Sequence, residues 1–298
     1  MDGPPVGSYV YVHNDSWALQ LLGPDVFTRT LSKPTRTDEF GNPWQYHSRS
    51  DHHSKVACAL IMLDLLEHCA ALAAHVRDGK VMFGINHEMR DFAHNRKKNL
   101  DLVICTPASG GRRNGQTLFD VCQKLEIAFS AGELSQIKAL PVLEMAPVGN
   151  VLMALEAKAC MTAHQKALPR LYDELNSSHQ TVHGAAESAI AVGFVCINAA
   201  TNYLSPDRNK RKLKGDPTWS EHKQPKATDV TFQKIREIPR RSRSTGEGYD
   251  ALGVVIMDFR NDGTPAQLVD LPPLGDIYHY NSMVDRITGA YTSRFSAI

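Results

Sequence analysis

The sequence predicts a mixed α/β fold, in which helices flank both faces of a central mixed sheet of four to five strands. Unbroken apolar runs such as LDLVICT (100–106), VLMALEAKAC (151–160) and AIAVGFVCINAA (189–200) are typical of buried strands. Longer segments between them carry apolar residues at helical spacing. Because strands and helices alternate along the chain, a layered sheet with helices packed on it is the favoured architecture.

The composition is that of a globular protein, with 298 residues, 42% hydrophobic and 22% charged. No apolar run reaches the roughly 18 to 20 residues of a membrane span, and the first residues lack the basic and apolar regions of a signal peptide. The six cysteines form no CxxC pair and lie mostly in apolar segments, which indicates a reducing compartment and no zinc site. We expect a cytoplasmic protein without membrane contact.

The first elements are an irregular arm and a long helix. Residues 1–50 mix Gly, Pro and polar residues with short apolar pieces, and we expect this arm to pack on the core. From Asp51 or Ser54, either of which is a fair N-cap, helical spacing continues for about six turns without Gly or Pro until Gly79. This pattern predicts one largely buried helix.

Two β-rich runs follow, at 80–85 and 100–106, separated by the polar, basic stretch NHEMRDFAHNRKKN. They predict neighbouring strands joined by a long loop. The later elements are a short helix at about 117–129, a central strand at 151–160, a polar helix at about 162–178 with Pro169 near a bend, a buried strand at 189–200, and a final strand and helix. We therefore expect a single domain over 51–298, with a hydrophilic, basic insertion at about 205–248.

Two carboxylates and one amine fall on two of these predicted strands. Asp101 opens one strand, and Glu156 and Lys158 stand at the end of another. Alternate residues of a strand share a face, so Glu156 and Lys158 project together while Ala157 points into the core. Asp101 joins them if the two strands are neighbours. Such a cluster suits phosphodiester hydrolysis, because carboxylates hold the divalent cation that offsets the negative charge of the phosphate.

Each residue of this cluster has an expected role. Asp101, Glu156 and the backbone carbonyl of Ala157 would bind Mg²⁺, for which Mn²⁺ would substitute. Lys158 would orient or deprotonate the attacking water, or stabilise the scissile phosphate. One more carboxylate could come from Glu88 or Glu67.

Asp101, the Glu156-Ala157-Lys158 triplet and the helices before and after them resemble the PD-(D/E)XK nuclease superfamily, which includes most Type II restriction endonucleases. The resemblance covers roughly residues 51–204. Leu100 replaces the proline of the family's name, and the 54 residues from 102 to 155 exceed the usual gap, so 107–149 would be an insertion between adjacent strands. The resemblance implies a restriction-endonuclease-like sheet whose active site lies where two strands diverge.

By the same resemblance the chain would be a Mg²⁺-dependent DNA endonuclease, acting as a homodimer in restriction or phage defence. The expected DNA contacts are Lys97, Lys98, His164, Lys166 and Arg170. Although the formal net charge is only +1, basic residues gather in three clusters that could form a positive cleft. The clusters are Arg90/Arg96/Lys97/Lys98, Arg208/Lys210/Arg211/Lys212/Lys214 and Arg236/Arg240/Arg241/Arg243.

Two other classes of protein fit the same residues. The chain could be a DNA-binding module of nuclease fold without catalysis. It could also be a structural protein without a nucleic-acid partner, in which Asp101 caps a turn and Glu156 and Lys158 form an ion pair on an edge strand.

Overall fold

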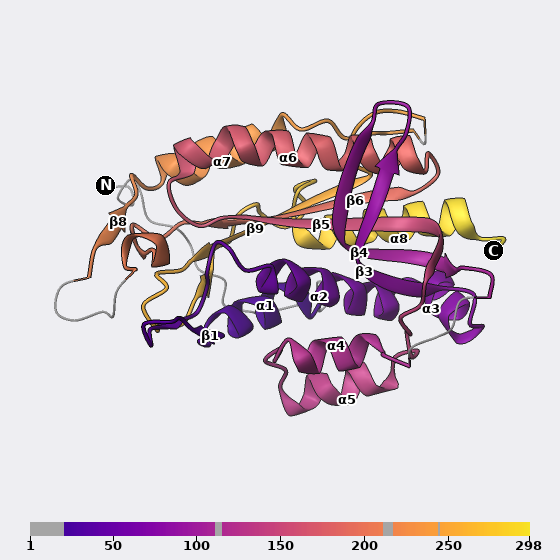
Figure 1. Ribbon diagram of the computed structural model, residues 1–298, viewed down its shortest axis with the longest axis horizontal. Coiled ribbons are helices and arrows are strands. Elements are labelled where there is room, and N and C mark those ends of the chain that lie inside the picture. Colours follow the sequence, from indigo (N-terminus) through magenta and orange to yellow (C-terminus); the bar gives the residue numbers. More distant parts are fainter. Residues whose placement is uncertain (1–20, 111–114, 211–216, 244) are drawn as a thin grey trace, which may run out of the picture.

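A mixed sheet of six strands, in the order β10-β9-β6-β5-β4-β3, forms the centre of the molecule (Figure 1). The structure, a computed structural model, describes residues 21–110, 115–210, 217–243 and 245–298. The strands are β3 (Met82–Asp91), β4 (Arg96–Pro107), β5 (Val148–Cys160), β6 (Ile190–Asn198), β9 (Ala251–Asp258) and β10 (Gln267–Leu268). The mixed α/β class is confirmed, but the count of four to five strands is wrong, because the two-residue β10 is too short to leave a sequence pattern.

Helices cover both faces of this sheet. The helices are α1 (Gly23–Leu31), α2 (His52–His68), α3 (Ala70–Arg77) and α8 (Tyr280–Phe295) on one side, α6 (His164–Ala185) and α7 (Lys226–Arg236) on the other, and α4 (Leu118–Lys124) and α5 (Ala131–Ala139) beyond α2 (Figure 1). Two apolar cores result, one on each face of the sheet.

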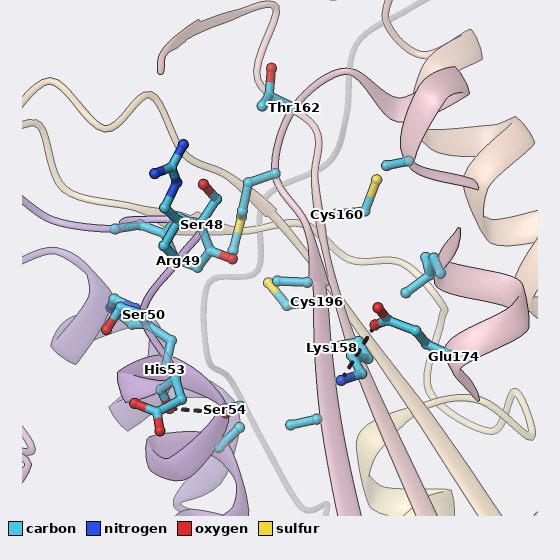
Figure 2. Close-up of a pocket in the computed structure, with 18 of the residues that line it drawn as sticks. Ser48, Arg49, Ser50, His53, Ser54, Lys158, Cys160, Thr162, Glu174 and Cys196 are labelled. Carbon is cyan, nitrogen blue, oxygen red and sulfur yellow. Dashed lines mark hydrogen bonds and ion pairs between the residues drawn. The ribbon is translucent and has the colours of Figure 1, made fainter. Parts of the chain in front are cut away.

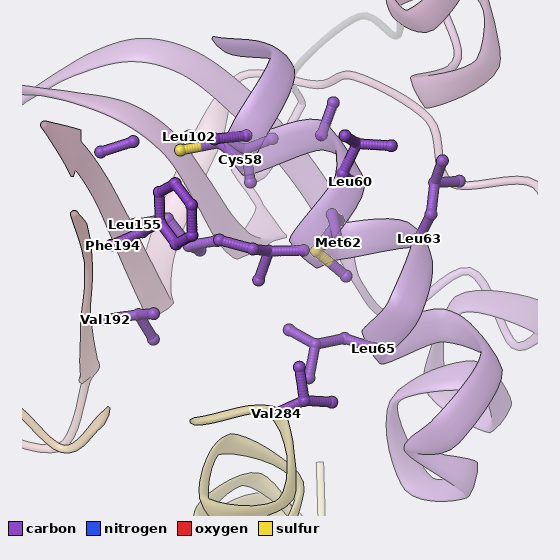
Figure 3. Close-up of a cluster of buried hydrophobic side chains, with 14 of the residues drawn as sticks. Cys58, Leu60, Met62, Leu63, Leu65, Leu102, Leu155, Val192, Phe194 and Val284 are labelled. Atoms are coloured by element: carbon purple, nitrogen blue, oxygen red, sulfur yellow. The ribbon is translucent and has the colours of Figure 1, made fainter. Parts of the chain in front are cut away.

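Helix α2 lies at the centre of the larger core. Every residue from Val56 to Leu66 is buried, as expected of a helix that is apolar all round. Leu60, Met62 and Leu65 are at most 1% exposed in a cluster that α2 forms with the sheet and α8 (Figure 3). The start of α2 is thereby fixed against the sheet, which matters for the site described below.

The predicted single helix after Asp51 is in fact two helices. Cys69, with φ −102° and ψ 91°, is extended, and the axes of α2 and α3 differ by 95°. The break needs no Gly or Pro, because the bend lets α3 pack against α8, where His75 and the Tyr291 hydroxyl share a hydrogen bond of 3.0 Å. Tertiary contacts override a continuous helical pattern here.

The predicted long loop between the first two strands is also wrong. Strands β3 and β4 continue through it as an antiparallel hairpin paired from Met82↔Cys105 to Asp91↔Arg96. Its polar residues alternate between a solvent face and a face against α6, so the stretch contains too few apolar residues to show a strand pattern.

Other segments contain more structure than the sequence predicts. Residues 1–20 of the predicted arm and 211–216 of the predicted insertion lie outside the described residues. The arm contributes α1, and residues 205–248 contain α7, whose Ile235 is buried on the α6 side. Small elements complete the fold: β1 (Arg36–Thr37), β2 (Pro43–Trp44), β7 (Asn202–Leu204), β8 (Trp219–Glu221) and a 3₁₀ turn (Pro206–Arg208).

The pairing of β5 positions the site. Its antiparallel register with β4 stops at Leu102↔Leu155, whereas its parallel register with β6 continues to Cys160↔Ile197. Strands β4 and β5 are therefore neighbours, as the predicted insertion over 107–149 requires. Asp101 and Glu156 are the first residues beyond their last pair, Leu102↔Leu155, and lie where the two strands separate. β5 is an interior strand of the sheet and not an edge strand.

Candidate active site

The separation of β4 from β5 brings Asp101 next to the Glu156-Ala157-Lys158 segment. Asp101 Oδ2 accepts a hydrogen bond of 2.9 Å from the backbone N–H of Ala157. Asp101 Oδ1 accepts one of 2.9 Å from the hydroxyl of Ser54 in the first turn of α2. The carboxylate thus bridges the sheet and the buried helix at the point where the two strands part, which fixes its position.

Glu156 and Lys158 share a face of β5, as the alternation of a strand requires. Lys158 Nζ lies 2.6 Å from Glu156 Oε1. The Glu156 side chain is only 4% exposed, and its Oε2 is buried without a hydrogen-bond partner among the described residues. Leaving a carboxylate oxygen in this state is unfavourable, since a buried polar group without a partner loses about 1 to 3 kcal/mol or more.

Ala157, between these two residues, is buried in the core on the α2 side. The structure thus agrees with the alternation inferred from the sequence for all three residues of the triplet.

Glu174 of α6 is a fourth member of the cluster, and the sequence analysis missed it. Its Oε2 lies 3.5 Å from Lys158 Nζ, and its Oε1 accepts a hydrogen bond of 2.6 Å from Arg170 Nε (Figure 2). Lys98 Nζ reaches its backbone carbonyl at 3.4 Å. The available signal was its spacing four residues after Arg170 on the helix that follows β5, which places both side chains on one face.

Burial raises the pKa of both carboxyls of the cluster. Burial raises the pKa of Glu156, and the charge of Asp101 raises it further, against the lowering effect of Lys158. Burial likewise raises the pKa of Asp101, despite the hydrogen bonds from Ala157 and Ser54.

The amine has the opposite balance. Burial works to lower the pKa of Lys158, but Glu156 and then Glu174 and Asp101 outweigh it, so the pKa is raised. Lys158 is therefore a cation at neutral pH, with a proton to donate in hydrogen bonds. In this arrangement it suits the stabilisation of an anion better than the removal of a proton from water.

The donor set fits a magnesium ion. Mg²⁺ commonly binds one or two protein carboxylates and keeps several waters, and Asp101 and Glu156 supply two carboxylates, of which Asp101 raises the pKa of Glu156. A cation bound here would offset this effect of Asp101 and engage the unpartnered Glu156 Oε2. Across the described ranges, no group of three or more His, Cys, Asp or Glu side chains is arranged to hold a metal. Two carboxylates and a carbonyl would therefore have to suffice.

A cavity of about 500 Å³ opens beside this cluster (Figure 2). Asp101, Lys158 and Glu174 line one part of it. The opposite wall comes from the segment that leads into α2, including Arg49, which lies 3.4 Å from Asp207. Asp101, Lys158 and Glu174 therefore face a space large enough for a ligand, and cavities of this size are typical of small-molecule sites.

Neither alternative carboxylate lies in the cluster. Glu88 points away on the hairpin, where its Oε2 is 3.4 Å from Lys97 Nζ. Glu67 is exposed near the far end of α2, thirteen residues after Ser54, or roughly 20 Å along the helix axis. The third carboxylate of the cluster is instead Glu174, which contacts Lys158.

The expected DNA contacts divide into exposed and buried residues. Lys97, Lys166 and Arg170 are exposed, and Lys98 is half-buried beside Glu174. His164 is 3% exposed, its Nε2 lies 2.8 Å from the Asn198 carbonyl, and burial lowers its pKa to about 4. A neutral, buried imidazole offers no charge to a phosphate, so we leave this residue out of the interface proposed below.

Several arginines of the three basic clusters are buried or already paired with other groups of the protein. Arg241 is buried, with its Nε 2.7 Å from Asp250 Oδ1, and Arg236 forms an ion pair of 2.9 Å with Asp276. Arg208 donates to the Trp219 carbonyl. Arg211, Lys212 and Lys214 lie outside the described residues. The cations of the β3–β4 cluster, all of which the structure describes, gather on a projecting element.

Comparison with known proteins gives no match to a family model, a curated protein or a solved structure. Among the described helices, none is by itself long and apolar enough to cross a membrane. Only α2 and α3 taken together meet that test of length and composition, and they are bent by 95° and mostly buried.

Proposed function

We propose that this chain is a Mg²⁺-dependent DNA endonuclease of the PD-(D/E)XK type. One observation carries the proposal: Asp101, Glu156 and Lys158, from segments 54 residues apart, meet where β4 and β5 separate, beside a cavity. The order of the triplet and the position of the aspartate at the strand divergence are those implied by the resemblance. Glu174 and Ser54 hold Lys158 and Asp101 in place.

Each residue of the cluster has its own role in the proposed hydrolysis. Asp101, Glu156 and the carbonyl of Ala157 would hold Mg²⁺, which supplies Lewis-acid activation of the phosphate and of a bound water. Lys158, held as a cation by Glu156 and Glu174, donates hydrogen bonds to a non-bridging oxygen of the scissile phosphate and stabilises its developing charge. Glu174 acts through Lys158 and is a positioning residue.

The location of the cluster favours this reading over a purely structural ion pair. Such a pair was expected on an edge strand, but β5 lies inside the sheet and Glu156 is buried. Burying two carboxylates and an amine together is costly, because desolvation of each ion offsets much of their attraction. Buried groups whose pKa values are shifted by burial and by charged neighbours concentrate at functional sites.

Cleavage of supercoiled plasmid DNA in Mg²⁺ tests the proposal. We expect nicked and linear products from the wild-type chain, none in EDTA, and at least a 100-fold loss of rate in Lys158→Ala. Lys138→Ala is the control, because this exposed lysine lies on α5 and does not line the cavity. Metal-independent DNA binding without cleavage would instead indicate a binding module of nuclease fold.

The biological setting is part of the same proposal. A restriction or phage-defence role requires cuts in both DNA strands, which two copies of this site in a homodimer would supply. Sedimentation of the protein with and without duplex DNA, together with the ratio of nicked to linear product, tests this requirement. A monomer that releases only nicked plasmid would contradict it.

A further inference from the structure

The outer half of the β3–β4 hairpin projects from the sheet and forms a separate surface (Figure 1). The direction of the hairpin changes at Asn86, which has a φ of +51° and lies between the cross-strand pairs Ile85↔Leu102 and His87↔Leu100. Positive φ is uncommon for residues other than glycine and marks a local turn of the backbone. The position opposite Asn86 is Asp101, so the hairpin bends beside the catalytic cluster.

The tip of this hairpin is fixed by a buried carboxylate. Asp91, 1% exposed, accepts hydrogen bonds from the backbone N–H groups of Ala93 (3.0 Å) and His94 (3.2 Å) and lies 2.8 Å from the His94 ring. The bonds close the turn over residues 92–95. The backbone therefore has little freedom to fold Phe92 inward.

Helix α6 holds the hairpin from one side. Arg96 donates a hydrogen bond of 2.5 Å to Gln180, and Gly184 lies so close that a Cβ there would be 2.3 Å from the Asp91 carboxyl carbon. The glycine lets the turn and the helix approach. The projecting hairpin is thus docked, and its other face is left to solvent.

Phe92 stands at the exposed end of this docked element. Its side chain is 79% exposed, the largest value among the large hydrophobic residues of the described chain. The guanidinium of Arg90 lies 5.0 Å from the ring centroid. An aromatic ring held in water by a buried turn loses the stabilisation that burial would give it, roughly 1.5 to 3 kcal/mol.

The charges beside Phe92 are also arranged unfavourably for the isolated protein. Arg90 and Lys97 are directly opposite each other across the two strands, and both are exposed. Like charges in this position destabilise a hairpin. Glu88, 3.4 Å from Lys97, offsets one of them in part. A polyanion bound along this face would neutralise the repulsion between Arg90 and Lys97 and make their proximity favourable.

The spacing from the catalytic cluster matches a nucleic acid. Asp101 lies five residue steps after Arg96 along β4, which corresponds to at most roughly 17 Å. At about 3.4 Å per base-pair step, this is about five steps of duplex DNA. Lys98, which contacts the Glu174 carbonyl, lies on the path between the tip and the cluster.

We propose that the β3–β4 tip is a DNA wedge, in which Phe92 inserts between bases of the duplex while Arg90 and Lys97 bind the flanking phosphates. The inference rests on the proposed function for its choice of partner. Apolar side chains at the ends of protein elements unstack base steps in this way, and a two-stranded β-ribbon fits a DNA groove. The wedge would bend or open the DNA about five base pairs from the cut.

Binding of the full chain to short mixed-sequence duplexes, without divalent cation, tests the wedge. Aromatic stacking on a base predicts that Phe92→Ala weakens binding roughly 5- to 100-fold. Phe92→Trp retains the affinity of the wild type. Val142→Ala, which truncates another exposed hydrophobic residue, is the matched control and leaves affinity unchanged. Arg90→Gln lowers the salt dependence of binding by about one counterion.

Fluorescence of 2-aminopurine in the duplex gives a second readout. Wild-type protein raises the emission at a position about five base pairs from the cut, because an unstacked base fluoresces more strongly, and Phe92→Ala does not. Equal affinities and equal emission for wild type, Phe92→Ala and Val142→Ala would overturn the wedge. So would a Phe92→Ala change in sedimentation alone, which would assign the tip to a protein contact.

The wedge and the nuclease activity fail in different assays. Phe92→Ala lowers cleavage only as far as it weakens DNA binding, so excess protein restores Lys158-dependent cleavage of the plasmid. A wild-type chain that does not cleave would contradict the nuclease proposal, and the binding and fluorescence results would still decide the wedge.

Discussion

At the scale of single residues, the alternation of a strand was enough to place Glu156 and Lys158 together and to bury Ala157. The partnership with Asp101 could not be read from the sequence in the same way, because it depends on two strands pairing across 54 residues. The spacing of Glu174 after Arg170 places the two side chains on one helix face but does not reveal the contact with Lys158. Its contact with Lys158 follows from how α6 packs on the sheet, and no periodicity encodes that packing.

His53 gives a stability prediction at this scale. It is 4% exposed, and burial, followed by the charge of His52, lowers its pKa to about 3 against the raising effect of the Gln45 backbone. An unfolded histidine binds a proton near pH 6.5, so the folded state loses stability as the pH falls below that value. The unfolding free energy of His53→Phe minus that of the wild type should therefore be about 2 kcal/mol more favourable to the variant at pH 5 than at pH 7.

Urea unfolding of both proteins at the two pH values measures this gain. A difference in unfolding free energy that is the same at both pH values would show that burial of His53 is not coupled to its protonation.

At the scale of elements, the sequence located five of the six strands and most of the larger helices, because long apolar patterns survive any packing arrangement. It failed where tertiary contacts decide the local backbone. The bend at Cys69 exists because α3 packs on α8, and the outer β3–β4 hairpin exists because α6 supports one of its polar faces. Helices α4 and α5 begin with capping boxes, Thr117 with Asp120 and Ser130 with Glu133, which are helix-start signals present in the sequence.

Two helical glycines test the docking of the hairpin on α6. At Gly184 a Cβ would overlap the Asp91 carboxylate, so Gly184→Ala should destabilise the protein by roughly 1 to 3 kcal/mol. At Gly289 of α8 a Cβ would meet nothing within 4 Å, so Gly289→Ala should stabilise it by roughly 0.5 to 1 kcal/mol. Urea unfolding at neutral pH compares them. Two substitutions with equal effects would contradict the close approach of α6 to the turn.

At the scale of the whole molecule, one buried carboxylate joins distant parts of the chain. Asp250, 3% exposed, contacts Arg241 at 2.7 Å, His183 of α6 at 3.4 Å and Arg294 of α8. It also accepts a hydrogen bond of 2.8 Å from the backbone of Ala191 in β6. Helices on opposite faces of the sheet are thereby connected through the start of β9.

Replacing this carboxylate should weaken the entire fold. Asp250→Asn leaves the 1%-exposed Arg241 without a neutralising charge, and breaking such a buried pair costs about 3 to 5 kcal/mol. Burial opposes ionisation of Asp250, but His183, Arg241 and Arg294 hold its pKa far below the usual value. A carboxyl whose pKa is lower in the folded state stabilises that state at pH values above its unfolded pKa. This contribution to stability is lost as the pH falls below the unfolded pKa.

The expected result is therefore a large loss of stability for Asp250→Asn at pH 7 that narrows towards about pH 3, as the wild type loses the same contribution. Chemical denaturation at several pH values measures it. A constant difference between the two proteins across that range would show that the charge of Asp250 is not what connects the helices.

The antiparallel pairing of β4 with β5 has a consequence for how this protein can vary. The connection between them leaves at Pro107 and returns at Val148, whereas Asp101 and Glu156 stand at the other end of the two strands, roughly 20 Å away. The length of residues 108–147, with α4 and α5, therefore does not set the spacing between Asp101 and Glu156, the carboxylates proposed to bind the metal. Segments can be lost, gained or exchanged at that end of the sheet while these two carboxylates stay at the opposite end.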